Sequence, residues 1–172
     1  RSDRGPRRPS RGRAMFGGMK TPLDRLASTA PAFAPTVLRL GLAAVFLAHA
    51  WAKVSLFTLP GTAAFFEQHG FPGWTAYPVF AIELAGAVAL ALGFQVRATA
   101  AILAVVMVGA LVPHVHNGWM FTNAGGGWEY VAFLLVALAA QGMLGAGRWT
   151  ALARAEDQRR PSTTTFRTAS GE

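Results

Sequence analysis

An apolar stretch near the start of the chain reads VLRLGLAAVFLAHAWAKVSLFTL (residues 37–59). An α-helix rises about 1.5 Å per residue, so about 20 residues cross the roughly 30 Å of hydrocarbon in a bilayer. Three further apolar stretches follow at residues 74–94, 96–113 and 128–147. The stretch 96–113 is the shortest of the four. It can still span, because the long side chain of Arg97 at its start can extend toward the headgroups. The sequence therefore predicts an all-α integral membrane protein, an up-and-down four-helix bundle.

The composition excludes the main alternatives to a membrane protein. Of 172 residues, 52% are hydrophobic, 14% are charged and none is cysteine. A disordered chain has far less apolar content, a disulfide scaffold needs cysteine, and a soluble domain carries about 25% charged residues. The length leaves room for one domain.

The net charge of +8 is concentrated at the two ends. Residues 1–35 carry eight Lys and Arg against two Asp and Glu, and residues 148–172 carry five against three. These ends are rich in Pro, Ser, Gly and Arg, so we expect flexible tails at 1–35 and 151–172 around a membrane domain at 36–150. We interpret the charge as orienting a membrane protein and expect no nucleic-acid partner.

The connections between the spans give the same orientation. Loops 60–73 and 114–127 contain no Lys or Arg, whereas the Arg97 turn and both tails do. By the positive-inside rule both termini are then cytoplasmic, and the chain crosses the inner membrane several times. Residues 60–73 predict a short interfacial helix between the first two spans. A competing interpretation, a signal peptide cleaved near residue 50, is disfavoured because the apolar stretch continues beyond that point.

Three polar residues lie inside the predicted spans. His49 and Lys53 are four apart and share one helical face, and Glu83 lies near the middle of the second span. Counting from the outer ends puts Glu83 at a depth of about 14 Å, His49 at about 15 Å and Lys53 at about 9 Å. Because a charge at the helix centre opposes insertion, Glu83 needs a partner, and we expect it to meet Lys53 or His49.

Small residues on the same two spans predict that these helices approach each other closely. Gly86 and Ala87 follow Glu83 by three and four residues, and Ala44, Ala48 and Ala52 recur every four residues on the first span. Such residues let helix backbones come together in a membrane.

Further polar residues follow the third span and begin the fourth. His114, His116 and Glu129 can converge above the buried groups and form a polar entrance on the outer side. Each also has a simpler interpretation: Glu129 complements the positive end of the fourth helix, and the two histidines are too few for a zinc site, so we expect no metal.

The function of the buried pair remains open between several interpretations. Lys53 and Glu83 can be a packing ion pair that fixes helix register. Alternatively, a small bundle with a polar interior can bind a flat amphipathic ligand such as a quinone, whose ring oxygens accept hydrogen bonds from Lys or His, or it can pass protons. No catalytic triad, paired carboxylate or nucleotide motif is present in the sequence.

Six short motifs occur in an order and spacing that resembles the DoxX family of bacterial membrane proteins. They are LRL (38–40), FLAHAWAK (46–53), GTAAFFE (61–67), ELAG (83–86), HNG (116–118) and GGGWEY (125–130). The resemblance covers about residues 36–150.

The resemblance implies a four-helix protein of the bacterial cell membrane. Such a protein would be related to the small subunit of an archaeal thiosulfate:quinone oxidoreductase or terminal quinol oxidase, which the family resembles. It implies a quinone- or redox-associated subunit with a membrane or peripheral redox partner, and at most a subunit of an enzyme. The alternative is a non-catalytic scaffold or a pathway for protons or small solutes. The positions that match the family's polar pattern are His49, Lys53, Glu83, His116, Asn117 and Glu129.

Overall fold

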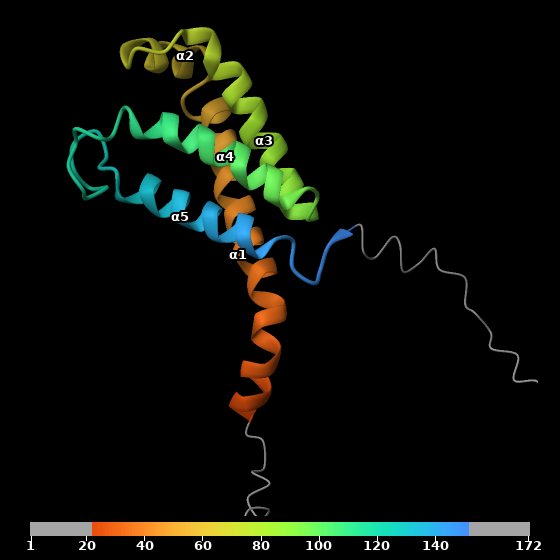
Figure 1. Cartoon of the computed structure of the whole chain (residues 1–172). Helices are drawn as coiled ribbons and strands as arrows, with labels where there is room; N and C mark the ends of the chain where they lie inside the picture. Colours follow the sequence, from red (N-terminus) through yellow and green to blue (C-terminus); the bar gives the residue numbers. More distant parts are fainter. Residues whose placement is uncertain (1–21, 152–172) are drawn as a thin grey trace, which may run out of the picture. The chain divides into compact units, whose positions relative to one another are not determined.

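A computed structural model describes residues 22–151 of the chain (Figure 1). What the sequence predicts for residues 1–21 and 152–172 lies outside this range. Five α-helices and one 3₁₀ turn make up the described part, which contains no β-strand. The elements are α1 (Pro22–Ser55), α2 (Leu59–Gln68), η1 (Gly73–Thr75), α3 (Ala76–Leu92), α4 (Val96–Leu111) and α5 (Glu129–Leu144). The all-α class is therefore correct.

Helix α1 begins earlier than the sequence suggested. It starts at Pro22, within the segment 1–35 that we expected to be a flexible tail, and it contains Pro31 and Pro35. Each proline removes one backbone hydrogen bond from a helix, which is why the composition of this segment pointed away from helix. From Pro31 onward the chain forms one compact unit, and the described residues before it belong to a separate unit.

The short helix expected between the first two spans is α2. The Thr58 side chain accepts a hydrogen bond from the backbone N–H of Gly61 at 3.1 Å and so caps its first turn. The helix ends at Gln68, His69 caps it, and Gly70 follows with a φ of 84°. The 3₁₀ turn η1 then leads directly into α3.

A tight turn joins α3 to α4. Gly93 ends α3 in the left-handed conformation with a φ of 75°, and its N–H donates to the carbonyl of Leu90. A glycine after the last helical residue is the usual way to satisfy the free carbonyls of a helix end. The turn is as short as the sequence predicts, so α3 and α4 are antiparallel neighbours.

Helix α4 packs against both α3 and α5 (Figure 1). Large apolar side chains of α1, α3, α4 and α5 meet in one core, in which the most buried are Phe46, Leu90, Leu103 and Leu138. All four apolar stretches of the sequence therefore contribute one face to a common core.

The expected close approach of the first two spans through small residues is wrong. Ala44 and Ala48 are exposed instead of packed against α3. Gly86 faces α4, where a methyl group at this position would lie 2.9 Å from Cδ2 of Leu103. Gly86 of α3 thus accommodates a leucine of α4, the helix that the short turn places beside α3.

Two helical segments, Ala30–Ser55 and Gly73–Leu92, are long and apolar enough to cross a membrane. Helices α4 and α5 are also apolar but have 16 residues each, or about 24 Å of helix. Large apolar side chains remain exposed on both, including Val105 on α4 and Phe133 and Met143 on α5. Exposed apolar surface of this extent is typical of a protein that contacts lipid.

Candidate functional site

Lys53 and Glu83 form an ion pair between α1 and α3. The Nζ atom of Lys53 donates to Oε2 of Glu83 at 2.6 Å. The side chain of Glu83 is 3% exposed and that of Lys53 is 17% exposed. The structure therefore brings together the two charges that lie deepest in the predicted spans.

The helical repeat explains why Glu83 points inward. Glu83, Gly86, Ala87 and Leu90 are all buried and follow the spacing of one α-helical face. The carboxylate thus occupies a core position on an otherwise apolar helix face. A buried charge of this kind requires a partner, and Lys53, in the last turn of α1, supplies it.

His49 lies one turn before Lys53 and connects the pair to α5. Its imidazole ring packs edge-on against the ring of Tyr130, with 6.0 Å between ring centroids and an angle of 61° between planes. His49 is half-buried and within electrostatic range of both Lys53 and Glu83. Among the described residues, neither His49 nor Tyr130 has a side-chain hydrogen bond.

We call Lys53, Glu83, His49 and Tyr130 the polar cluster. Its members come from α1, α3 and α5, so it forms only when three helices pack together. Lys53 has three donor hydrogens, of which Glu83 takes one. The polar cluster therefore retains donors that can hydrogen-bond a ligand carbonyl, within reach of an aromatic ring.

Asn117 and Glu129 are instead bound within the loop between α4 and α5. The amide of Asn117 donates to the carbonyls of Pro113, Gly125 and Gly126, each at 3.0 Å. Oε1 of Glu129 accepts from the backbone N–H of Phe121 at 2.9 Å. Both side chains thus organise the loop 112–128.

His116 is exposed, and no hydrogen bond or ion pair in the described range joins His116, Asn117 or Glu129 to Lys53 or Glu83. His114 is also held by the loop, since its Nδ1 lies 3.0 Å from the carbonyl of Gly126. The structure consequently divides the sequence-predicted site residues into a buried group between helices and a loop group. No cluster of three or more potential metal ligands occurs among residues 22–151.

Two buried polar residues were not singled out as site residues from the sequence. Arg39 is 2% exposed and donates to the carbonyls of Leu90 at 2.8 Å, Ala91 at 3.2 Å and Trp149 at 2.5 Å. Gln141 is fully buried in α5 and donates to the carbonyl of Gly145 at 2.6 Å. Both bind backbone carbonyls near helix ends.

Tyr130 was also missed as a member of the site, although it closes the motif GGGWEY. The signal that could have found it is its position near the start of the predicted span 128–147, where a polar aromatic side chain faces either the interface or a neighbouring helix.

The apolar helices and the buried ion pair define the class to which this chain belongs, namely a helical membrane protein with charged groups inside its helix packing. The model of one family, DoxX, matches residues 34–117. These residues of the chain therefore form a DoxX domain. The match begins inside α1, continues through α4, contains His49, Lys53 and Glu83, and ends before α5. No curated protein and no solved structure gives a significant match to the chain.

Proposed function

We propose that this protein is the membrane subunit of a quinone-linked oxidoreductase system and that the polar cluster binds the quinone ring. The observation that carries this proposal is the ion pair of Lys53 and Glu83, which lies between apolar helices close to His49 and Tyr130, two polar side chains that make no hydrogen bond within residues 22–151. Intramembrane ionisable residues mark ligand or ion sites more often than they serve packing alone.

The chemistry of the polar cluster suits a quinone. Its ring oxygens accept hydrogen bonds, which the free Nζ hydrogens of Lys53 and a ring nitrogen of His49 can donate. The aromatic ring of Tyr130 offers an edge or face for the quinone ring. The isoprenoid tail can remain in lipid, beside the exposed apolar side chains of the same helices.

Electron transfer requires a partner under this proposal. The chain has no cysteine for an iron–sulfur cluster and no sequence motif for a flavin. A membrane or peripheral redox protein would deliver or remove the electrons, and this chain would hold the quinone. We further propose that α1, α3, α4 and α5 all cross the inner membrane, with both termini in the cytoplasm.

The test is to purify the protein in mild detergent, extract the co-purifying lipids and quantify quinone per chain. We expect near-stoichiometric quinone in the wild type and a several-fold lower content in Lys53→Met and His49→Gln. His69→Gln is the control, because His69 is a half-buried histidine at the end of α2, outside the polar cluster. It should retain the wild-type content.

Absence of quinone from the wild type would refute the proposal. If the same preparation then leaks protons in liposomes, and Glu83→Gln stops the leak, the polar cluster belongs to a proton pathway instead. Equal quinone content in the wild type and in His49→Gln would exclude His49 from binding.

A further inference from the structure

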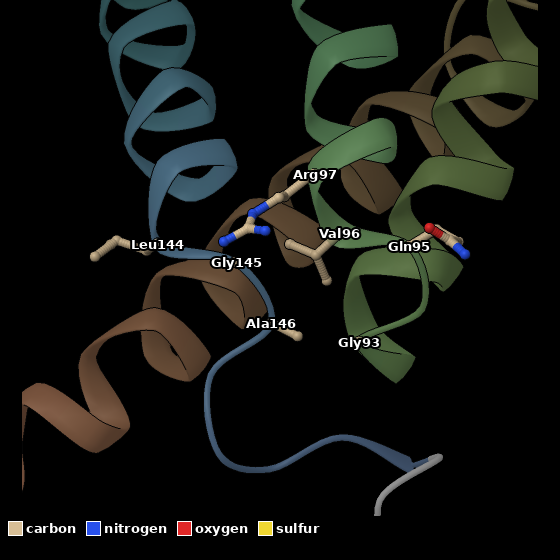
Figure 2. Close-up of a pocket in the computed structure, with 7 residues that line it drawn as sticks. All are labelled: Gly93, Gln95, Val96, Arg97, Leu144, Gly145 and Ala146. Carbon is tan, nitrogen blue, oxygen red and sulfur yellow. The ribbon is translucent and has the colours of Figure 1, made fainter.

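A shallow pocket of about 430 Å³ lies at the other end of the helices from loop 112–128. The α3–α4 turn forms one side of it and the end of α5 the other (Figure 2). Seven residues line it: Gly93, Gln95, Val96, Arg97, Leu144, Gly145 and Ala146. We call it the turn pocket.

Arg97 is the one ionisable residue among those that line the turn pocket. It is exposed, and its guanidinium has no hydrogen bond or ion pair with any residue of the described range. No aspartate or glutamate lines the pocket to neutralise it. The turn pocket is therefore cationic and complementary to an anion.

The backbone of Gly145 leaves space in front of this guanidinium. Gly145 ends α5 with φ and ψ angles of 76° and −158°, a conformation that only glycine adopts readily. A methyl group at position 145 would lie within 3.6 Å of Nη2 of Arg97. A side chain here would cover the group that Figure 2 shows pointing from α4 toward Gly145.

Buried polar side chains hold both sides of the turn pocket. Gln141 binds the carbonyl of Gly145, and Arg39 binds the carbonyls of Leu90 and Ala91 just before Gly93. Each side of the turn pocket is thus held by a buried hydrogen bond of its own before any ligand arrives. A preorganised site loses less entropy on binding.

Exposed apolar side chains border the same region. Leu92 and Phe94 precede the pocket on one side, and Leu144 lines it on the other. In a membrane protein, a cationic pocket next to apolar surface lies where a phosphate headgroup meets its acyl chains. Free phosphate would make no use of these apolar neighbours.

We propose that the turn pocket binds the phosphate headgroup of an anionic phospholipid through Arg97. This site is separate from the polar cluster, so it stands whether or not the protein binds quinone. One cationic side chain near an anionic membrane surface contributes enough to change affinity about fivefold.

The test uses the full chain in detergent, titrated with phosphatidylglycerol or phosphatidylcholine and followed by native mass spectrometry. We expect tighter binding of phosphatidylglycerol, about fivefold weaker binding in Arg97→Gln, and most of the affinity retained in Arg97→Lys. The matched control is Arg148→Gln, which removes an exposed positive charge near the same end but outside the pocket. It should change the affinity less than twofold.

A second variant guards against misfolding of Arg97→Gln. Ala146→Glu introduces an acid into the turn pocket and keeps Arg97, and it should also weaken phosphatidylglycerol binding. Equal losses in Arg97→Gln and Arg148→Gln would overturn the proposal, because binding would then follow net charge alone. Competition by millimolar inorganic phosphate would overturn it in favour of a free-phosphate site.

Discussion

The guanidinium of Arg39 on α1 donates to the carbonyl of Leu90 at the end of α3, with 2.8 Å between Nη1 and the oxygen. It also binds the carbonyl of Trp149, so one buried side chain joins three segments that are far apart in the sequence. The last carbonyls of a helix lack intrahelical partners and carry partial negative charge, which a cation satisfies. Arg39 therefore fastens α1 and the segment after α5 to the end of α3.

Replacing Arg39 by methionine should destabilise the protein strongly. The change keeps the apolar stem but removes the hydrogen bonds that Arg39 donates to the carbonyls of Leu90, Ala91 and Trp149, at a cost of about 2–5 kcal/mol in the free energy of unfolding. Thermal unfolding in detergent, followed by circular dichroism, measures the effect. Arg148→Met, at an exposed position, is the control and should change the melting temperature little. Equal melting temperatures for wild type and Arg39→Met would contradict the role assigned to Arg39.

Gly93→Ala should destabilise the turn between α3 and α4. Gly93 has a φ of 75°, where a Cβ costs about 1 kcal/mol, and the added methyl would meet Nη1 of Arg39. Gly109→Ala is the matched control, because Gly109 lies inside α4 with open space around it, and alanine there should stabilise the helix by up to about 1 kcal/mol. The two variants should shift the melting temperature in opposite directions. An unchanged or raised melting temperature in Gly93→Ala would show that the turn does not depend on glycine.

The ion pair of Lys53 and Glu83 predicts strong coupling between two substitutions. Glu83→Leu alone leaves the ammonium of Lys53 without its carboxylate and should cost about 3–5 kcal/mol. The double variant Lys53→Leu with Glu83→Leu removes both charges and should recover most of this stability. A double-mutant cycle on melting temperatures measures the coupling. Additive effects would mean that the two side chains do not depend on each other.

The same double variant separates packing from function. If the pair serves packing alone, the double variant should keep wild-type quinone content and any wild-type activity of the assembled system. Under the proposed function it should fold and yet lose quinone. A stable double variant that retains quinone would therefore assign Lys53 and Glu83 to helix packing.

The sequence predicted the helices well because their signals are local. The turn at Gly93 and the apolar stretches follow from composition and from the length of helix that a bilayer requires. The meeting of Lys53 and Glu83 followed from their matched depths on two consecutive spans, since an unpaired charge at that depth is costly.

What the sequence did not predict depends on which helices are neighbours. The small face at Gly86 packs against Leu103 of α4, and nothing in the local pattern distinguishes α4 from α1 as its partner. The contact of Arg39 with Trp149 joins residues 110 positions apart, so it exists only in the folded chain. Asn117 and Glu129 looked like ligands because they are polar, and their partners are backbone groups of their own loop.

The proposed membrane topology predicts opposite accessibility for two introduced cysteines. The chain has no cysteine, so single substitutions can be labelled without background. Thr122 is exposed in the loop between α4 and α5, and Ala151 is exposed after the last helix. In intact spheroplasts, a membrane-impermeant maleimide should label Thr122→Cys at once and Ala151→Cys only after permeabilisation, because the Arg-rich C-terminal side is expected to face the cytoplasm. Labelling of both cysteines in intact spheroplasts would mean an even number of crossings between them, so α5 would not be a span. Labelling of neither would mean that the loop 112–128 faces the cytoplasm. The polar cluster would then have no entrance from the outer side.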